Sequence, residues 1–138
     1  MKDISNATDL IATARDALLN DLLPRLQKEQ RYTGLMIANA MAIALREQQS
    51  GADAMRGETT RIRKLLASVG SSERAPADSS IDELSVLRRD LCKAIRTGQF
   101  DDSHSSALVA NLGRTAADWL AISNPKALRT DHAPSHAS

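Results

Sequence analysis

The hydrophobic residues of the chain follow a helical period from near its start. From about Thr8 to Gln30, leucine, isoleucine and alanine recur every three or four residues, which is typical of one face of a helix. Asn6 or Thr8 is expected to cap this helix, because a short polar side chain accepts a hydrogen bond from the first turn. Pro24 lies inside the run, so the helix is expected to kink or restart there.

A second helix is predicted from Arg31 to Gln49. Between Leu35 and Leu45 the residues are apolar on nearly every side, which is typical of a buried central helix. Ser50-Gly51 is expected to end it, since glycine readily adopts the left-handed conformation that follows many helices. A third helix is then expected from Asp53 to Val69.

Two more helices are predicted beyond a polar segment. Gly70 to Ser80 is rich in turn-forming residues and indicates a surface loop. Ser80 and Glu83 fit a capping box at the start of the fourth helix, which Gly98 is expected to end. The segment Asp101–Ser103 supplies a candidate cap for the fifth helix.

The fifth helix carries an apolar stripe that includes Leu112 and Trp119, and Asn124-Pro125 is expected to stop it. No segment alternates hydrophobic and polar residues as a half-buried strand does. We therefore predict an all-α fold, a single bundle of about five helices with a buried central second helix. The bundle is expected to occupy residues 1–125, and a flexible tail is expected at residues 126–138.

The composition supports this prediction and indicates where the protein is located and which partners it attracts. Hydrophobic residues make up 42% of the 138 positions but aromatic residues only 2%, so aliphatic residues and alanine must fill the core. No apolar run has the length of a signal peptide or of a membrane span, so we expect a cytoplasmic protein without membrane association. The formal charge of +1 gives no strong attraction to nucleic acid.

The residue patterns that carry many well-known chemistries are missing. The one cysteine, Cys92, excludes an intrachain disulfide framework. The sequence has no glycine-rich phosphate loop, no HExxH or paired ExxH metal motif and no nucleophile elbow. We therefore predict no catalytic residue, metal or cofactor; the sequence favours a non-enzyme and leaves an enzyme open.

Two basic stretches can form an anion-binding face if their helices lie side by side. Such a face suits phosphate, a coenzyme A tail or nucleic acid, although no aromatic side chains interleave to stack on single strands. The alternative, that both stretches are ordinary solvent-exposed helix faces without a binding role, is favoured. The residues concerned are Arg56, Arg63, Lys64, Arg88, Arg89, Lys93 and Arg96.

A polar set around the second helix is the most specific feature. Asn39 and Arg46 lie about 20° apart around the helix axis, and a buried amide such as Asn39 needs hydrogen-bond partners. Glu58 and Arg61 on the next helix are candidate partners, and Glu47 can pair with a basic neighbour. The set is either a structural network that fixes helix register or a pocket for a small ligand. The structural interpretation is favoured, because no nucleophile or acid–base pair is evident.

The same residues carry a family likeness. The segment Ala38–Glu47 resembles the central ANAxxIxxRE motif of a bacterial all-helical family of unknown function. The likeness covers about residues 8–126 and continues through Glu58–Leu66, Ile95–Asp101 and Leu120–Pro125. Members of that family typically occur in genomes beside aminoglycoside-phosphotransferase-like kinases and acyl-CoA dehydrogenases. The resemblance implies an accessory role near acyl-CoA or small-molecule phosphorylation chemistry, and it assigns no reaction.

Two hypotheses follow from the sequence. The first is a cytoplasmic accessory module that binds a kinase-like or acyl-CoA dehydrogenase-like protein. The second is a small-ligand binder or minor enzyme that takes an acyl-CoA or a phosphorylated metabolite at the polar set between the second and third helices. Nucleic acid is not an expected partner, and the leucines of the first helix leave a homodimer open.

Overall fold

The computed structural model describes residues 6–71 and 81–132. Within these ranges it contains four α-helices and no strand, so the predicted all-α fold is confirmed, with four helices in place of about five. In chain order the elements are α1 (Ala7–Ala17), π-helical η1 (Leu18–Leu22), 3-10 helix η2 (Leu23–Arg25), α2 (Lys28–Ser68), α3 (Ile81–Arg96), 3-10 helix η3 (Asp102–His104), α4 (Ser105–Ser123) and 3-10 helix η4 (Pro125–His132).

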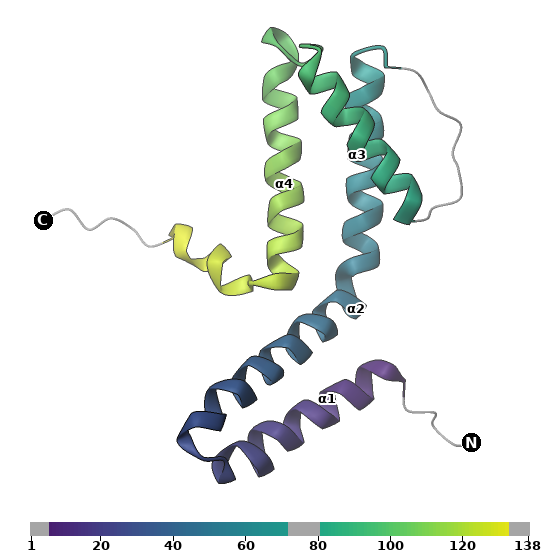
Figure 1. Cartoon of the computed structure of the whole chain (residues 1–138). Helices are drawn as coiled ribbons and strands as arrows, with labels where there is room; N and C mark the ends of the chain where they lie inside the picture. Colours follow the sequence, from purple (N-terminus) through teal and green to yellow (C-terminus); the bar gives the residue numbers. More distant parts are fainter. Residues whose placement is uncertain (1–5, 72–80, 133–138) are drawn as a thin grey trace, which may run out of the picture. The chain divides into compact units, whose positions relative to one another are not determined.

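The chain divides into two compact units. Unit 1 consists of Met1–Gly51 and Ile122–Asn124, and unit 2 consists of Ala52–Ala121 and Pro125–Ser138. The boundaries therefore fall inside α2 and near the end of α4, whose positions along the chain are coloured in Figure 1.

The helix break predicted at Pro24 is confirmed. The side chain of Asn6 caps α1 by accepting a hydrogen bond from the backbone amide of Asp9 at 2.9 Å, and α1 ends at Ala17. The chain then passes through η1 and η2, and Pro24 lies in η2. Because proline has no amide hydrogen and its ring collides with the preceding turn, the α-helix restarts only at Lys28.

The helix end predicted at Gly51 is wrong, because α2 runs through it without a break. A glycine ends a helix when its φ becomes positive, and among the described residues the glycines with positive φ are Gly70 and Gly98. Gly51 is instead buried within the helix, where a Cβ would lie 3.2 Å from Cγ of Glu47. A glycine in a helix interior lowers helix stability by about 1 kcal/mol relative to alanine. The hydrogen-bonded turns on both sides of Gly51 offset this loss.

In unit 1, α1 runs antiparallel to the first half of α2. Thr8 Oγ1 donates a hydrogen bond to Gln48 Oε1 at 2.7 Å, and Arg15 Nε donates to the backbone carbonyl of Ala38 at 3.1 Å. Ala38 is 3% exposed, and Gly34 one turn before it is also buried. These small residues allow the two helices to approach closely.

The first half of α2 is not the buried central helix that its composition predicts. Leu35, Met36 and Ile37 are 51%, 50% and 46% exposed. Within unit 1, α1 covers the face of α2 that carries Ala38, and one neighbouring helix cannot cover the other faces. An apolar sequence favours burial on every side, but it does not determine how many neighbours surround the helix.

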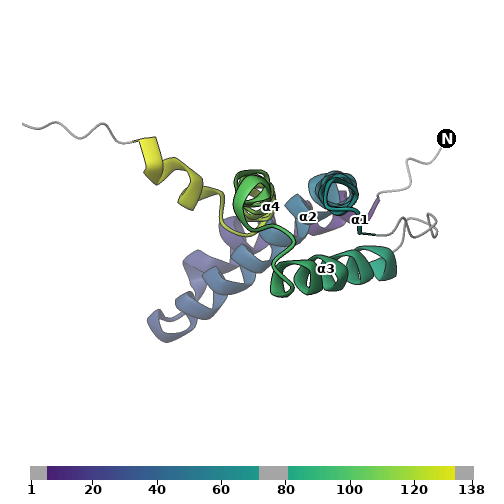
Figure 2. The ribbon, with the colours of Figure 1, turned by 90° about the horizontal axis from the view of Figure 1, so that it is seen from above.

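In unit 2, α3 crosses the second half of α2 obliquely, while α4 runs antiparallel beside it (Figure 1). Figure 2 shows α2 and α4 of this unit nearly end-on, with α3 lying across them. Partly buried Leu108 of α4 packs at the edge of the core. The core itself comes from α2, α3 and the turn after α3, and consists of Ile62, Leu65, Leu66, Leu84, Leu87, Leu91, Ala94 and Phe100.

The predicted helix ends have mixed outcomes. Ser80 lies outside the described residues, and so does the capping box that depends on it. Asp101 precedes η3 and makes no side-chain cap hydrogen bond, and α4 begins at Ser105, after the predicted capping segment. Residues 125–132 form η4 where no regular structure was expected, and residues 133–138 lie outside the described part. No helix in the described ranges is both long and apolar enough to cross a membrane.

Two glycines should respond oppositely to alanine. Gly98 has a φ of 77°, and a Cβ there would lie 2.9 Å from Asp101 Oδ2, so Gly98→Ala is expected to lower the free energy of unfolding by about 1–2 kcal/mol. A Cβ at Gly113, inside α4, would meet nothing within 4 Å, so Gly113→Ala is expected to raise it by about 0.5–1 kcal/mol. Urea denaturation measures both, and a neutral Gly98→Ala would contradict the turn geometry.

Candidate functional site

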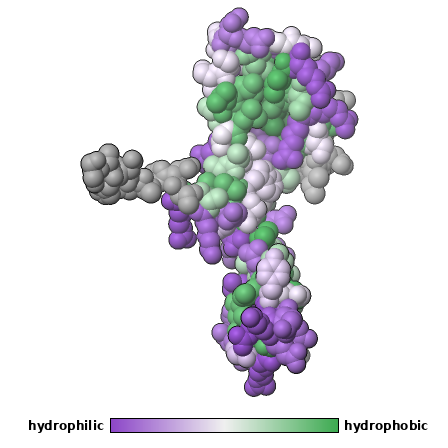
Figure 3. Space-filling view, turned by 60° about the vertical axis from the view of Figure 1, so that its left-hand side comes forward, coloured by the Kyte–Doolittle hydropathy of each residue, from purple (hydrophilic) through white to green (hydrophobic). Residues whose placement is uncertain are grey.

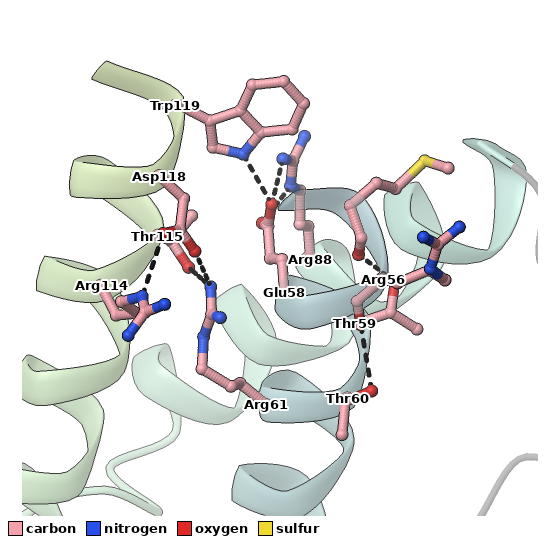
Figure 4. Close-up of polar contacts among 11 residues, drawn as sticks. Arg56, Glu58, Thr59, Thr60, Arg61, Arg88, Arg114, Thr115, Asp118 and Trp119 are labelled. Atoms are coloured by element: carbon pink, nitrogen blue, oxygen red, sulfur yellow. Dashed lines mark hydrogen bonds and ion pairs between the residues drawn. The ribbon is translucent and has the colours of Figure 1, made fainter. Parts of the chain in front are cut away.

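A buried carboxylate on α2 joins the three helices of unit 2. Glu58 is 3% exposed, and its Oε1 accepts a hydrogen bond from Arg88 Nε on α3 at 2.6 Å. Its Oε2 accepts from Arg88 Nη2 at 2.7 Å and from Trp119 Nε1 on α4 at 2.9 Å (Figure 4). Both oxygens are therefore occupied by donors from other helices.

The surroundings of Glu58 keep it ionised. Burial raises the pKa of this carboxyl group, but the hydrogen bonds from Arg88 and Trp119 and the positive charges of Arg88 and Arg61 outweigh burial. The net result is a pKa of Glu58 below its ordinary value. The hydrogen bond with Glu58 is in turn the main cause that raises the pKa of Arg88.

A second group of polar contacts joins α2 to α4. Arg61 Nη2 donates a hydrogen bond to Thr115 Oγ1 at 3.1 Å and lies 3.2 Å from Asp118 Oδ2. The other oxygen of Asp118 accepts from Arg114 Nε at 2.9 Å. Arg61 Nε is buried and has no hydrogen-bond partner among the described residues.

Helical spacing explains why these side chains converge. Glu58 and Arg61 are one turn apart on α2, so they share a face, and Thr115, Asp118 and Trp119 share a face of α4 for the same reason. We refer to the residues that meet there as the polar cluster. The polar cluster consists of Glu58, Arg61, Arg88, Arg114, Thr115, Asp118 and Trp119.

The arrangement suits a structural role better than catalysis. A general acid or base needs a pKa near the working pH, whereas the lowered pKa of Glu58 moves it away from neutrality. Both carboxylates of the polar cluster are engaged by arginines, which leaves neither aimed at a substrate. Within the described ranges, no group of three or more His, Cys, Asp or Glu side chains is placed to hold a metal ion.

The structure separates the predicted polar set. Glu58 and Arg61 belong to the polar cluster of unit 2, whereas Asn39, Arg46 and Glu47 belong to unit 1. Asn39 is exposed, so the expectation of a buried amide is wrong; it lies about 100° around the helix from Ala38, which faces α1.

The other two members of the predicted set also lack the expected network. Arg46 is half-buried, and its Nε donates to the backbone carbonyl of Ile122 at 2.6 Å. Glu47 is exposed and forms no ion pair within the described part of the chain.

Several members of the predicted anion-binding face are already paired with carboxylates. Arg56 pairs with Asp53, Arg63 pairs with Glu83, and Arg88 pairs with Glu58. Each pair reduces the positive charge that an incoming anion would meet. The exposed members without such an ion pair within the described ranges are Lys64, Arg89, Lys93 and Arg96.

The contribution of α4 to the polar cluster was missed at the sequence level. The pattern placed Trp119 and Leu112 on one buried apolar stripe, yet Leu112 is 46% exposed and the indole of Trp119 donates to Glu58. The signal was present in the spacing of Asn111, Thr115 and Asp118, which places polar residues on one helix face. Asn111 is 7% exposed, which agrees with an inward-facing polar stripe.

A search of protein-family models identifies the family. Residues 24–127 match the model described as Domain of unknown function (DUF6285), which covers most of the chain, so the chain belongs to this family. No curated protein and no solved structure gives a significant match. The family assignment agrees with the predicted likeness to a helical family of unknown function and carries no activity with it.

Replacing the buried carboxylate should expose its structural role. Glu58→Gln is expected to lower the free energy of unfolding at pH 7 by about 2 kcal/mol, because it removes charge-assisted hydrogen bonds to Arg88. Because the folded-state pKa of Glu58 lies below its ordinary value, this contribution is present at neutral pH and is lost as pH falls below the ordinary value and through the lowered folded-state value.

The deficit in the free energy of unfolding of Glu58→Gln relative to wild type should therefore shrink as the pH is lowered from neutral into the acid range, as followed by urea denaturation at each pH. Glu47→Gln is the matched control, because Glu47 is exposed. If the difference in the free energy of unfolding between wild type and Glu58→Gln stays constant with pH, Glu58 is not an ionised, hydrogen-bonded carboxylate in the folded protein.

Proposed function

We propose that this member of the family is a non-catalytic helical accessory module of the cytoplasm that binds a protein partner. The observation that carries the proposal is that the polar cluster leaves neither of its carboxylates unpaired. Glu58 and Asp118, the two carboxylates that acid–base chemistry would use, are both held by arginine side chains. The remaining conspicuous feature of unit 2 is then its exposed apolar surface.

Unit 2 presents hydrophobic side chains on its outside. Figure 3 shows such side chains gathered on one face of this unit. On α4, Val109 and Leu112 are 67% and 46% exposed, while Thr115 and Asp118 of the same helix contact Arg61 of α2. Exposed apolar clusters of this kind are typical of surfaces that bind proteins. The proposed partner is kinase-like or acyl-CoA dehydrogenase-like, a class suggested by the family likeness in the sequence.

Affinity purification tests this proposal. Tagged wild-type chain in lysate of the native organism is expected to enrich a kinase-like or dehydrogenase-like protein, identified by mass spectrometry. Val109→Lys should reduce that enrichment at least about tenfold, because it places a charge in the apolar contact. Thr60→Lys adds the same charge at an exposed position of α2 and serves as the matched control. Enrichment of neither protein class by wild type, or equal enrichment by both variants, would refute the proposal.

The alternative of a small-ligand site has one supporting observation, the buried Arg61 Nε without a partner. Acyl-CoA and phosphorylated metabolites carry anionic groups that a guanidinium binds well. The same atom is shielded from solvent, however, so a ligand would reach it only after the groups around it move. Thermal-shift measurements with acyl-CoAs, nucleotides and sugar phosphates separate the two functions, since a ligand that prefers the native state raises the melting temperature. We expect no shift at millimolar ligand.

A further inference from the structure

A row of positive charges runs along the outer face of α3. Arg89, Lys93 and Arg96 are exposed and follow one another at spacings of four and three residues. At about 100° per residue they lie within about 60° of one another around the helix axis, and at about 1.5 Å per residue they span about 10.5 Å along it. We refer to Arg89, Lys93 and Arg96 as the α3 basic stripe.

The packing of α3 fixes the direction of this stripe. The buried residues of the helix lie about 140–220° around the axis from Arg89, on the side opposite the stripe. Their burial in the core of unit 2 turns the stripe away from that core. The buried residues are Leu84, Leu87, Leu91 and Ala94.

The stripe differs from other arginines of unit 2 in its lack of carboxylate partners. Within residues 6–71 and 81–132, no ion pair involves any of its three cations. Five other arginines of the unit each contact a carboxylate, which neutralises them inside the fold. They are Arg56, Arg61, Arg63, Arg88 and Arg114. The charge of the α3 basic stripe therefore remains available to a partner.

The position of the stripe near the end of α3 accounts for two of its charges but not for the third. Lys93 and Arg96 lie in the last turn of the helix, where the negative end of the helix dipole favours cations. That effect falls off within one turn, and Arg89 lies about two turns before the end of the helix. A row that extends beyond the last turn matches a row of negative charges on a partner.

The number of charges and their spacing select the kind of partner. Acidic membranes are bound by clusters of about four to eight basic residues, and proteins that hold duplex DNA make about six to ten phosphate contacts. Three cations on a convex helix are fewer than either needs. A partner helix with carboxylates at spacings of four and three residues presents a row of the same length, and an arginine can bind a carboxylate through two parallel hydrogen bonds.

We propose that the α3 basic stripe binds an acidic helix of a protein partner, with carboxylates spaced to face Arg89, Lys93 and Arg96. Because the cations are exposed, each contact contributes little, so the binding is weak and is reduced further by salt. The stripe shares no residue with the apolar surface of α4 that carries Val109 and Leu112. This proposal therefore does not depend on the proposed function.

Fluorescence anisotropy of a labelled peptide tests the proposal with the full chain. The probe is an alanine-rich peptide of about 20 residues, long enough to form a helix in isolation, with three glutamates at spacings of four and three. Lys93→Glu is expected to raise the dissociation constant at least about fivefold, because it reverses the central charge of the stripe. Lys64→Glu is the matched control and should change the constant less than about twofold, since Lys64 is an exposed lysine of α2 without an ion pair in the described ranges.

A charge swap tests the pairing itself. The triple variant Arg89→Glu, Lys93→Glu, Arg96→Glu should lose the glutamate peptide and bind the same peptide with lysines in place of the glutamates. No binding of the glutamate peptide by wild type at about 1 mM and low salt, equal losses in Lys93→Glu and Lys64→Glu, or no binding of the lysine peptide by the triple variant would each overturn the proposal. Equally tight binding of a peptide with its glutamates scattered around the helix, or tighter binding of phosphatidylserine vesicles or duplex DNA that Lys93→Glu abolishes, would do the same. Circular dichroism checks that each variant remains helical.

Discussion

One ionised carboxylate, that of Glu58, organises unit 2. Moving a charged group out of water costs several kcal/mol, and only well-directed partners repay that cost. Glu58 has three such donor contacts, two from Arg88 on α3 and one from Trp119 on α4. Apolar packing has no preferred direction, so the core of α2 and α3 leaves helix placement loosely specified. The hydrogen bonds of Glu58 add the direction that the core lacks.

The inward polar face of α4 has a consequence for its outer face. Thr115, Asp118 and Trp119 contact α2, and Leu108 packs against the apolar core, whereas Val109 and Leu112 of the same helix remain exposed. The contacts with α2 hold α4 in the fold, and the exposed residues of α4 form the surface on which we place the proposed protein partner.

Unit 1 is held together differently. Its described tertiary contacts include hydrogen bonds from Thr8 to Gln48, from Arg15 to the carbonyl of Ala38 and from Arg46 to the carbonyl of Ile122. Small residues bring α1 and α2 together, but close approach of small side chains buries little apolar area. Large apolar residues of α2, namely Leu35, Met36 and Ile37, remain about half exposed.

Local physics determined the helical character of the chain, because hydrophobic period, the Asn6 cap and the break at Pro24 all act within a few residues. Those features, and the prominence of Glu58 and Arg61, were predictable from the sequence alone. Tertiary structure decided that Gly51 continues a helix, that Asn39 is exposed and that Trp119 donates to Glu58. Those outcomes depend on which helices become neighbours, and a one-dimensional pattern shows which face of a helix is apolar without showing what that face meets.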